Sequence, residues 1–125
     1  MYSVIRFGGF SNREQLDEVG ASVNSAIPHL FSGPDRVASR FSCTLSDDAD
    51  WEVHCKTIEE RVTALSLIIR KATLEGITME VDIAIMQEDH AGRFYTDYPL
   101  NPSLLRILLE NKIALRFTLY SGEGG

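Results

Sequence analysis

The most regular hydrophobic pattern in the chain follows Thr57. Apolar residues recur there at the spacing of one helical face, which consists of Ile58, Val62, Leu65, Ile69 and Ala72, with Ile68 at its edge. Thr57 and Glu60 have the spacing of a capping box, in which each side chain hydrogen bonds to the backbone of the other residue. Gly76 allows the left-handed conformation that commonly ends a helix. This pattern predicts one long amphipathic helix.

After Gly76 the pattern changes to an alternation of period two. One parity is apolar and the other is mostly acidic: Met79, Val81, Ile83 and Ile85 against Glu80, Asp82 and Ala84. Such alternation is typical of a strand with one buried and one polar face. Similar patterns predict strands over 2–8, about 37–45, 51–56 and 113–120, and a short extra strand over 93–98.

Turn and cap residues separate the first strands. Ser11 or Asn12 is a candidate cap for a short helix over about 12–20, which Gly20 is expected to end. Residues 21–36 are expected to form a loop that covers one edge of the core. The polar residues 46–50 predict a turn that joins two strands in a hairpin.

In this predicted hairpin Leu45 is expected to face Trp51. Further along the chain, Asn101 and Pro102 have the order of a helix cap and a first helical residue. Four leucines are expected to form the buried side of this last helix: Leu104, Leu105, Leu108 and Leu109.

These elements give the order β-α-β-β-α-β-(β)-α-β in one domain over 1–125, with 121–125 as a frayed tail. We expect an α+β two-layer sandwich, with a mostly antiparallel sheet of five or six strands and helices packed on one face. The polar face of the sheet would gather Arg40, Ser42, Thr44, Glu52, His54, Lys56, Glu80, Asp82, Arg116, Thr118 and Tyr120.

Composition narrows the class of protein. The chain is 44% hydrophobic and 24% charged, which is ordinary for a globular domain, and it has no long apolar run that would span a membrane. The first residues have a strand pattern and not that of a signal peptide. A net charge of −6 disfavours nucleic-acid binding. We therefore expect a cytoplasmic protein in which Cys43 and Cys55 are free, buried and unreactive.

Acidic residues are concentrated between residues 47 and 60. Six carboxylates lie there against one cation, Lys56: Asp47, Asp48, Asp50, Glu52, Glu59 and Glu60. One interpretation is a solvated turn followed by a helix N-terminus, where acidic residues interact favourably with the helix dipole. The other interpretation is a docking surface for a basic partner.

No group of residues has the spacing of a known catalytic or metal site. The three histidines are isolated from one another, and the glycines form no phosphate-binding loop. His54 is expected near Ser42 on the polar sheet face, but without the acid and oxyanion donors of a catalytic triad. Glu80 and Asp82 favour a charged, solvated sheet face that Arg40 and Arg116 offset, with a divalent metal site as the alternative. We therefore expect no cofactor, no metal and no enzymatic activity.

Two leucines depart from the amphipathic pattern. Leu67 and Leu74 lie opposite the apolar stripe of the long helix. Either the 21–36 loop or the last helix covers them, or they contact another chain.

Three stretches at the two ends of the chain contain recognisable structural motifs. Tyr2 to Ser11 (YSVIRFGGFS) contain a first strand, a glycine and the start of a helix. Residues 100–109 (LNPSLLRILL) contain a leucine helix that begins with proline, and residues 113–120 (IALRFTLY) contain a terminal strand. Together they resemble a widespread bacterial family of domains of unknown function, some members of which are immunity proteins encoded beside toxins. The tryptophan strand and helix after Trp51 fit in the same order, and Arg116 stands where the family usually has Asp. The resemblance assigns no site residues.

The resemblance, the acidic residues between 47 and 60 and the lack of a catalytic motif together predict an immunity-type protein. Such a protein binds a cognate toxin, for example a nuclease of contact-dependent growth inhibition, and occludes its active site. The alternative is a small-ligand-binding or enzymatic domain that uses His54 with Glu52, Glu80 or Asp82. A third possibility is an assembly subunit that uses Leu67 and Leu74. The sequence leaves the oligomeric state open.

Overall fold

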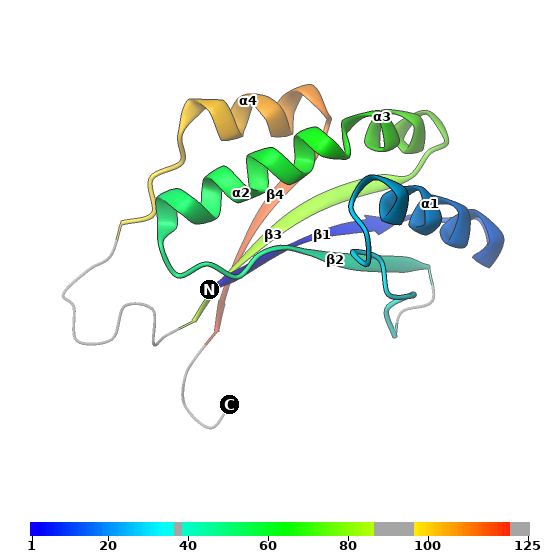
Figure 1. The fold of residues 1–125 in the computed structure, drawn as a ribbon, viewed down its shortest axis with the longest axis horizontal. Coiled ribbons are helices and arrows are strands. Elements are labelled where there is room, and N and C mark those ends of the chain that lie inside the picture. Colours follow the sequence, from blue (N-terminus) through cyan, green and yellow to red (C-terminus); the bar gives the residue numbers. More distant parts are fainter. Residues whose placement is uncertain (37–38, 87–96, 121–125) are drawn as a thin grey trace.

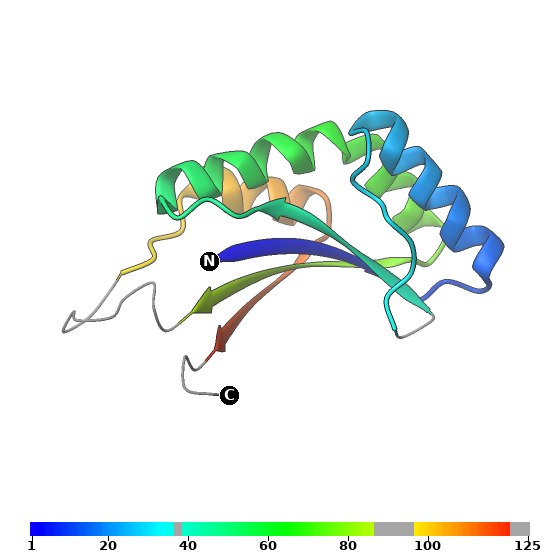
Figure 2. The ribbon, with the colours of Figure 1, turned by 60° about the horizontal axis from the view of Figure 1, so that its bottom comes forward.

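The computed structural model describes residues 1–36, 39–86 and 97–120. Its strands are β1 (Tyr2–Gly8), β2 (Arg40–Ser46), β3 (Thr78–Met86) and β4 (Ala114–Tyr120), and its helices are α1 (Arg13–Ala26), α2 (Trp51–Ala64), α3 (Ser66–Leu74) and α4 (Pro102–Glu110). The helices all lie on one face of the sheet (Figure 1), and Figure 2 shows the other face without any described helix.

The sheet has the strand order β2-β1-β3-β4. β1 pairs antiparallel with β2 and with β3, whereas β4 runs parallel to β3, because the chain returns through α4 between these two strands. The expected α+β class and the mostly antiparallel sheet are confirmed. The described residues form four strands, so the prediction of five or six is wrong.

The core lies between the sheet and the helices. The predicted inward residues of β3 and the whole predicted helical stripe are buried: Met79, Val81, Ile83, Ile85, Ile58, Val62, Leu65, Ile69 and Ala72. Gly76 has a φ of 84°, as its predicted role requires. Cys43 and Cys55 are free and buried, which confirms these two parts of the prediction. No described helix is long and apolar enough to cross a membrane.

The segment 51–56 is helical, so the predicted hairpin is wrong. The Asp50 side chain accepts a hydrogen bond from the Val53 backbone N–H at 3.1 Å, and α2 therefore begins at Trp51. The predicted capping box at Thr57 is also wrong, because the Thr57 hydroxyl donates to the Val53 carbonyl at 2.9 Å inside the helix.

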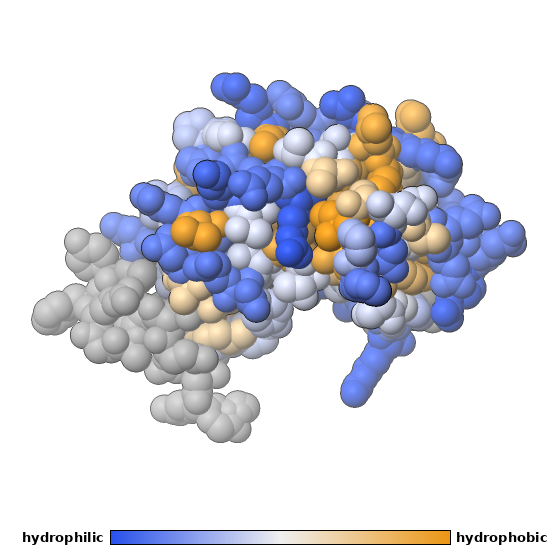
Figure 3. All heavy atoms as spheres, in the orientation of Figure 1, coloured by the Kyte–Doolittle hydropathy of each residue, from blue (hydrophilic) through white to orange (hydrophobic). Residues whose placement is uncertain are grey.

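The predicted long helix is divided in two at Leu65. This residue has φ −94° and ψ 1°, so α3 leaves the axis of α2 (Figure 1). Leu67 and Leu74 on α3 are 77% and 89% exposed, which overturns the prediction that another segment covers them. Figure 3 shows hydrophobic residues gathered over α3 and toward α1, with hydrophilic residues around them.

α1 is longer than expected and α4 is buried along a narrower face. Gly20 lies inside α1, where the ring of Phe31 packs against it, and does not end the helix. Asn101 and Pro102 begin α4 as predicted. Two of its leucines, Leu104 and Leu108, are buried, whereas Leu105 is 43% and Leu109 is 79% exposed. Residues 97–98, which belong to the predicted strand 93–98, are not in a strand. The other residues of that predicted strand, 93–96, and the predicted tail 121–125 lie outside the described residues.

Candidate functional site

The acidic surface consists of Asp47, Asp48, Asp50, Glu52, Glu59 and Glu60, which lie in the turn before α2 and on the first part of that helix. All are exposed except Glu59, which is half-buried. No ion pair with a described residue engages any of these carboxylates. The structure therefore places the six predicted residues in one region, where no described side chain forms an ion pair with them.

Two of the six carboxylates also shape the backbone. Asp50 is the N-cap of α2, and Asp48 accepts a hydrogen bond from the Asp50 backbone N–H at 2.8 Å. Asp50 and also Glu52, which lies in the first turn of α2, thus fit the interpretation that acidic side chains favour the helix start, whereas Asp48 stabilises the turn before it. Glu59 and Glu60 lie beyond the first turn, so capping does not account for them.

A buried histidine holds this turn in place. The His54 ring is fully buried, and its Nδ1 lies 2.9 Å from the Asp48 carbonyl oxygen. Since a carbonyl only accepts, Nδ1 carries the hydrogen, and Nε2 accepts a hydrogen bond from the buried hydroxyl of Ser3. Burial lowers the pKa of His54 below its ordinary value, although the hydrogen bond to Asp48 opposes this effect. The neutral ring thus connects β1 to the acidic turn.

A groove borders the acidic surface where α2 approaches the chain before α4. It has a volume of about 440 Å³ and is lined by Trp51, Glu52, Cys55, Lys56, Glu59, Pro99, Leu100 and Asn101. The Trp51 indole N–H donates to the Pro99 carbonyl at 2.7 Å, which fixes the ring at the groove wall. Two carboxylates of the acidic surface therefore stand beside an oriented aromatic ring.

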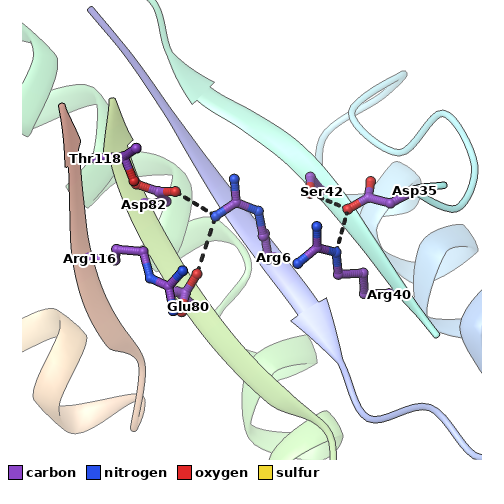
Figure 4. A network of polar contacts seen from close by, with 8 residues as sticks. All are labelled: Arg6, Asp35, Arg40, Ser42, Glu80, Asp82, Arg116 and Thr118. Atoms are coloured by element: carbon purple, nitrogen blue, oxygen red, sulfur yellow. Dashed lines mark hydrogen bonds and ion pairs between the residues drawn. The ribbon is translucent and has the colours of Figure 1, made fainter. Parts of the chain in front are cut away.

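The open face of the sheet carries a second group of charged residues (Figure 4). Arg6 Nη1 lies 2.6 Å from Asp82 Oδ2 and 3.2 Å from Glu80 Oε1, and Arg116 Nη2 lies 3.3 Å from Glu80 Oε2. Thr118 donates to Asp82 at 2.7 Å. Burial disfavours the charged form of Arg6, but the hydrogen bonds to Asp82 and Glu80 outweigh this effect and raise its pKa. Each of the two carboxylates is thus neutralised within the network.

A second pair continues this network on β2. Arg40 Nε lies 3.1 Å from Asp35 Oδ2, and Ser42 donates to the same carboxylate at 2.8 Å. The prediction that Arg40 and Arg116 offset Glu80 and Asp82 is confirmed for Arg116, which pairs with Glu80, and is wrong for Arg40, which pairs with Asp35. Sequence analysis missed Arg6, the main partner, although its place on the outward parity of β1 was a usable signal.

The residues of the alternative, enzymatic prediction (His54 with Glu52, Glu80 or Asp82) lie on two different sides of the sheet. Glu52, His54 and Lys56 belong to α2 on the helix side, so their predicted position on the polar sheet face is wrong. His54 contacts Ser3, and not Ser42 as expected. Glu80 and Asp82 lie on the face of the sheet without helices (Figure 4), whereas His54 belongs to α2 on the other face (Figure 1).

Neither the thiols nor the metal-binding residue types form a further site in the described part of the chain. Burial raises the pKa of Cys43 to about 12 and that of Cys55 to about 11, which keeps both thiols protonated at neutral pH. No group of three His, Cys, Asp or Glu among the described residues is arranged to hold a metal ion.

Comparison of the chain with protein-family models, with curated proteins and with solved structures found no match. The resemblance of its two ends to the family that includes immunity proteins stays a prediction.

Proposed function

We propose that this protein is a toxin-neutralising inhibitor of the immunity type, without catalytic activity of its own. It binds a basic bacterial toxin, for example a nuclease, through the acidic surface and blocks the toxin's active site. Its place of action would be the cytoplasm, where Cys43 and Cys55 would stay reduced.

The contrast between the two charged regions carries this proposal. On the open sheet face, Asp35, Glu80 and Asp82 are paired with arginines, so that face has little field to offer a partner. The carboxylates of the acidic surface have no such partners among the described residues. Their field extends about 8 Å into physiological salt, which is far enough to steer a basic protein toward them.

The acidic surface also suits rapid and specific binding because its backbone is held in place. Its turn is hydrogen bonded to His54, and its helix is capped by Asp50. A surface that is ordered before binding loses less conformational entropy when the complex forms. A nuclease site is basic because it holds phosphates, so a rigid acidic surface would compete with the substrate.

The test is to neutralise the four carboxylates that accept no backbone hydrogen bond from a described residue, as Asp47→Asn, Glu52→Gln, Glu59→Gln and Glu60→Gln in one variant. The partner is the product of the neighbouring gene, co-expressed and purified with the chain. If each exposed pair contributes about 0.5 kcal/mol, the variant should bind about 30-fold more weakly by calorimetry at low salt. Its affinity should also depend less on salt concentration.

A matched control changes the same net charge elsewhere. Glu14, Glu18, Glu75 and Glu110 are exposed and lie outside the acidic surface, and their replacement by Gln should leave low-salt affinity nearly unchanged. Equal weakening in both variants would indicate a general charge effect. Unchanged affinity in the first variant would rule out the acidic surface, and failure to recover a basic, growth-inhibiting partner would reject the immunity function itself.

A further inference from the structure

We propose that the free edge of β4 pairs with the β4 edge of a second copy of this chain, which gives a two-fold dimer with one continuous sheet. The inference does not depend on the proposed toxin binding, because it involves backbone pairing and apolar side chains of β4 and none of the six carboxylates of the acidic surface. β4 is the last strand of the sheet, and Figure 2 shows it as the outermost one.

The opposite edge of the sheet is protected against such pairing. On β2, the Arg40 carbonyl accepts a hydrogen bond from the Asp35 backbone N–H at 2.9 Å, and the Thr44 carbonyl accepts one from Arg61 Nη1 at 3.0 Å. The pairing of β2 with β1 also contains an irregularity between Ser3 and Val4. Occupied carbonyls and bulges are devices that keep an edge strand from pairing with another chain.

Within the described residues, β4 lacks these devices. Its register with β3 is regular from Ala114 to Tyr120, and it contains no proline. No described loop or side chain hydrogen bonds to its backbone on the free side. It also exposes apolar side chains, since Phe117 is 41% and Leu119 is 75% exposed. A long, regular and apolar edge of this kind is a site for adding a strand.

The neighbouring helix extends the apolar region. α4 packs against α2 and β4, and Leu105 and Leu109 lie on a flank of α4 that the core does not cover. α4 lies over the β4 end of the sheet (Figure 1), so the flank turned away from α2 borders the free edge. In a continuous sheet the two α4 helices would lie on the same face, where these leucines would meet.

The sequence of β4 is complementary to itself in an antiparallel register. If Phe117 is opposite its own copy, Leu115 is opposite Leu119 and Arg116 is opposite Thr118. The helix side then pairs only apolar residues, and no like charges face each other, which is the arrangement that stabilises cross-strand pairs. A two-fold axis through Phe117 makes the same surface serve both copies.

The charge distribution favours a second copy over the basic partner of the acidic surface. The chain has a net charge of −6, which opposes self-association in general. β4 has no acidic residue and α4 has only Glu110, at its end, so repulsion is weakest at this edge. A basic protein would find no carboxylate on β4 to pair with.

The size of the contact sets the expected strength. β4 contributes an edge about 23 Å long, at about 3.3 Å per residue. With one flank of α4 this is a small interface, so we expect a Kd on the order of 1–100 μM. Sedimentation of the full chain over a dilution series should show a species of twice 14.0 kDa that dissociates on dilution.

The edge variant is Leu109→Lys with Leu119→Lys. Both leucines are mostly exposed, so the monomer should fold, and the charges should weaken the dimer at least tenfold. The control is Leu67→Lys with Leu74→Lys, two leucines of similar exposure on α3, which should not affect the dimer. A wild-type chain that stays monomeric at all concentrations would overturn the proposal, and so would a dimer lost only in the control variant.

A cross-linking experiment tests the register. Across the two-fold axis, Phe117→Cys would lie about 4.5–5.5 Å from its own copy between Cα atoms, within disulfide range. Ala114→Cys would be opposite Tyr120, about 20 Å from its own copy. Mild oxidation should give a covalent dimer for the first variant alone, since the native cysteines are buried. Equal cross-linking of both variants would refute this register.

Discussion

Replacement of Gly20 by Ala is expected to destabilise the protein, although glycine is a poor helix former and Gly20 lies inside α1. On helix propensity alone the change would stabilise the protein by about 1 kcal/mol. However, a Cβ at Gly20 would lie 2.5 Å from Cδ2 and Cε2 of Phe31 and 2.6 Å from its Cζ. These distances are about 1 Å shorter than a favourable carbon–carbon contact.

The Phe31 ring has little freedom to move away. The Asn24 side chain donates to the Phe31 carbonyl at 3.0 Å and accepts from its backbone N–H at 2.7 Å. The ring also packs edge-on against Phe41, with centroids 4.7 Å apart. Overpacking of this kind costs about 1–3 kcal/mol, so the net loss after the propensity gain should be about 1 kcal/mol.

A double-mutant cycle in urea, followed by circular dichroism, isolates the steric cost. In a Phe31→Ala background the contact is absent, and Gly20→Ala should then stabilise the protein by about 1 kcal/mol. The sign of the effect should therefore reverse between the two backgrounds. A stabilising effect of Gly20→Ala in the wild-type background would refute the argument that Phe31 requires glycine at this position.

Two further predictions concern buried polar groups. Arg6→Met should destabilise the protein by about 3 kcal/mol in urea unfolding, because it leaves the Asp82 carboxylate buried without its cation, whereas Arg13→Met in an exposed pair should cost less than about 0.5 kcal/mol. A similar loss of unfolding free energy in both variants would contradict the argument that burial of Asp82 makes its ion pair important. Because burial lowers the pKa of His54, the unfolded state takes up a proton first, and the free energy of unfolding should fall as the pH drops below about 6.5. His54→Gln should reduce this slope by at most about 1.4 kcal/mol per pH unit. An unaltered stability profile for His54→Gln would contradict the assignment of this pH dependence to His54.

Long periodic patterns were sufficient to predict the main elements. The stripe from Ile58 to Ala72 and the alternation from Met79 to Ile85 extend over many residues, so only one period fits each of them. Cap residues such as Asn101 and Gly76 act on adjacent backbone groups, and both have the predicted role. Such signals depend on residues close together in the chain, which is why sequence analysis detects them.

Short patterns were decided by the tertiary structure. Trp51, Val53 and Cys55 alternate as in a strand, but the segment is too short to distinguish a period of two from a helical period. His54 and Cys55 are adjacent and both buried, and His54 contacts Ser3 of β1, which favours the helix. Glycine is typical of a helix end, yet Gly20 lies inside α1 because Phe31 occupies the space that a side chain there would need. In both cases the deciding contact comes from another part of the chain.

The same division applies to the candidate site. The sequence by itself determined that acidic residues are concentrated between 47 and 60, since this is a property of neighbouring positions. Only the tertiary structure decided which carboxylates are neutralised, because Arg6 reaches Glu80 and Asp82 through the pairing of β1 with β3. Charges far apart in the chain meet according to strand order and register, and these depend on how the whole core packs.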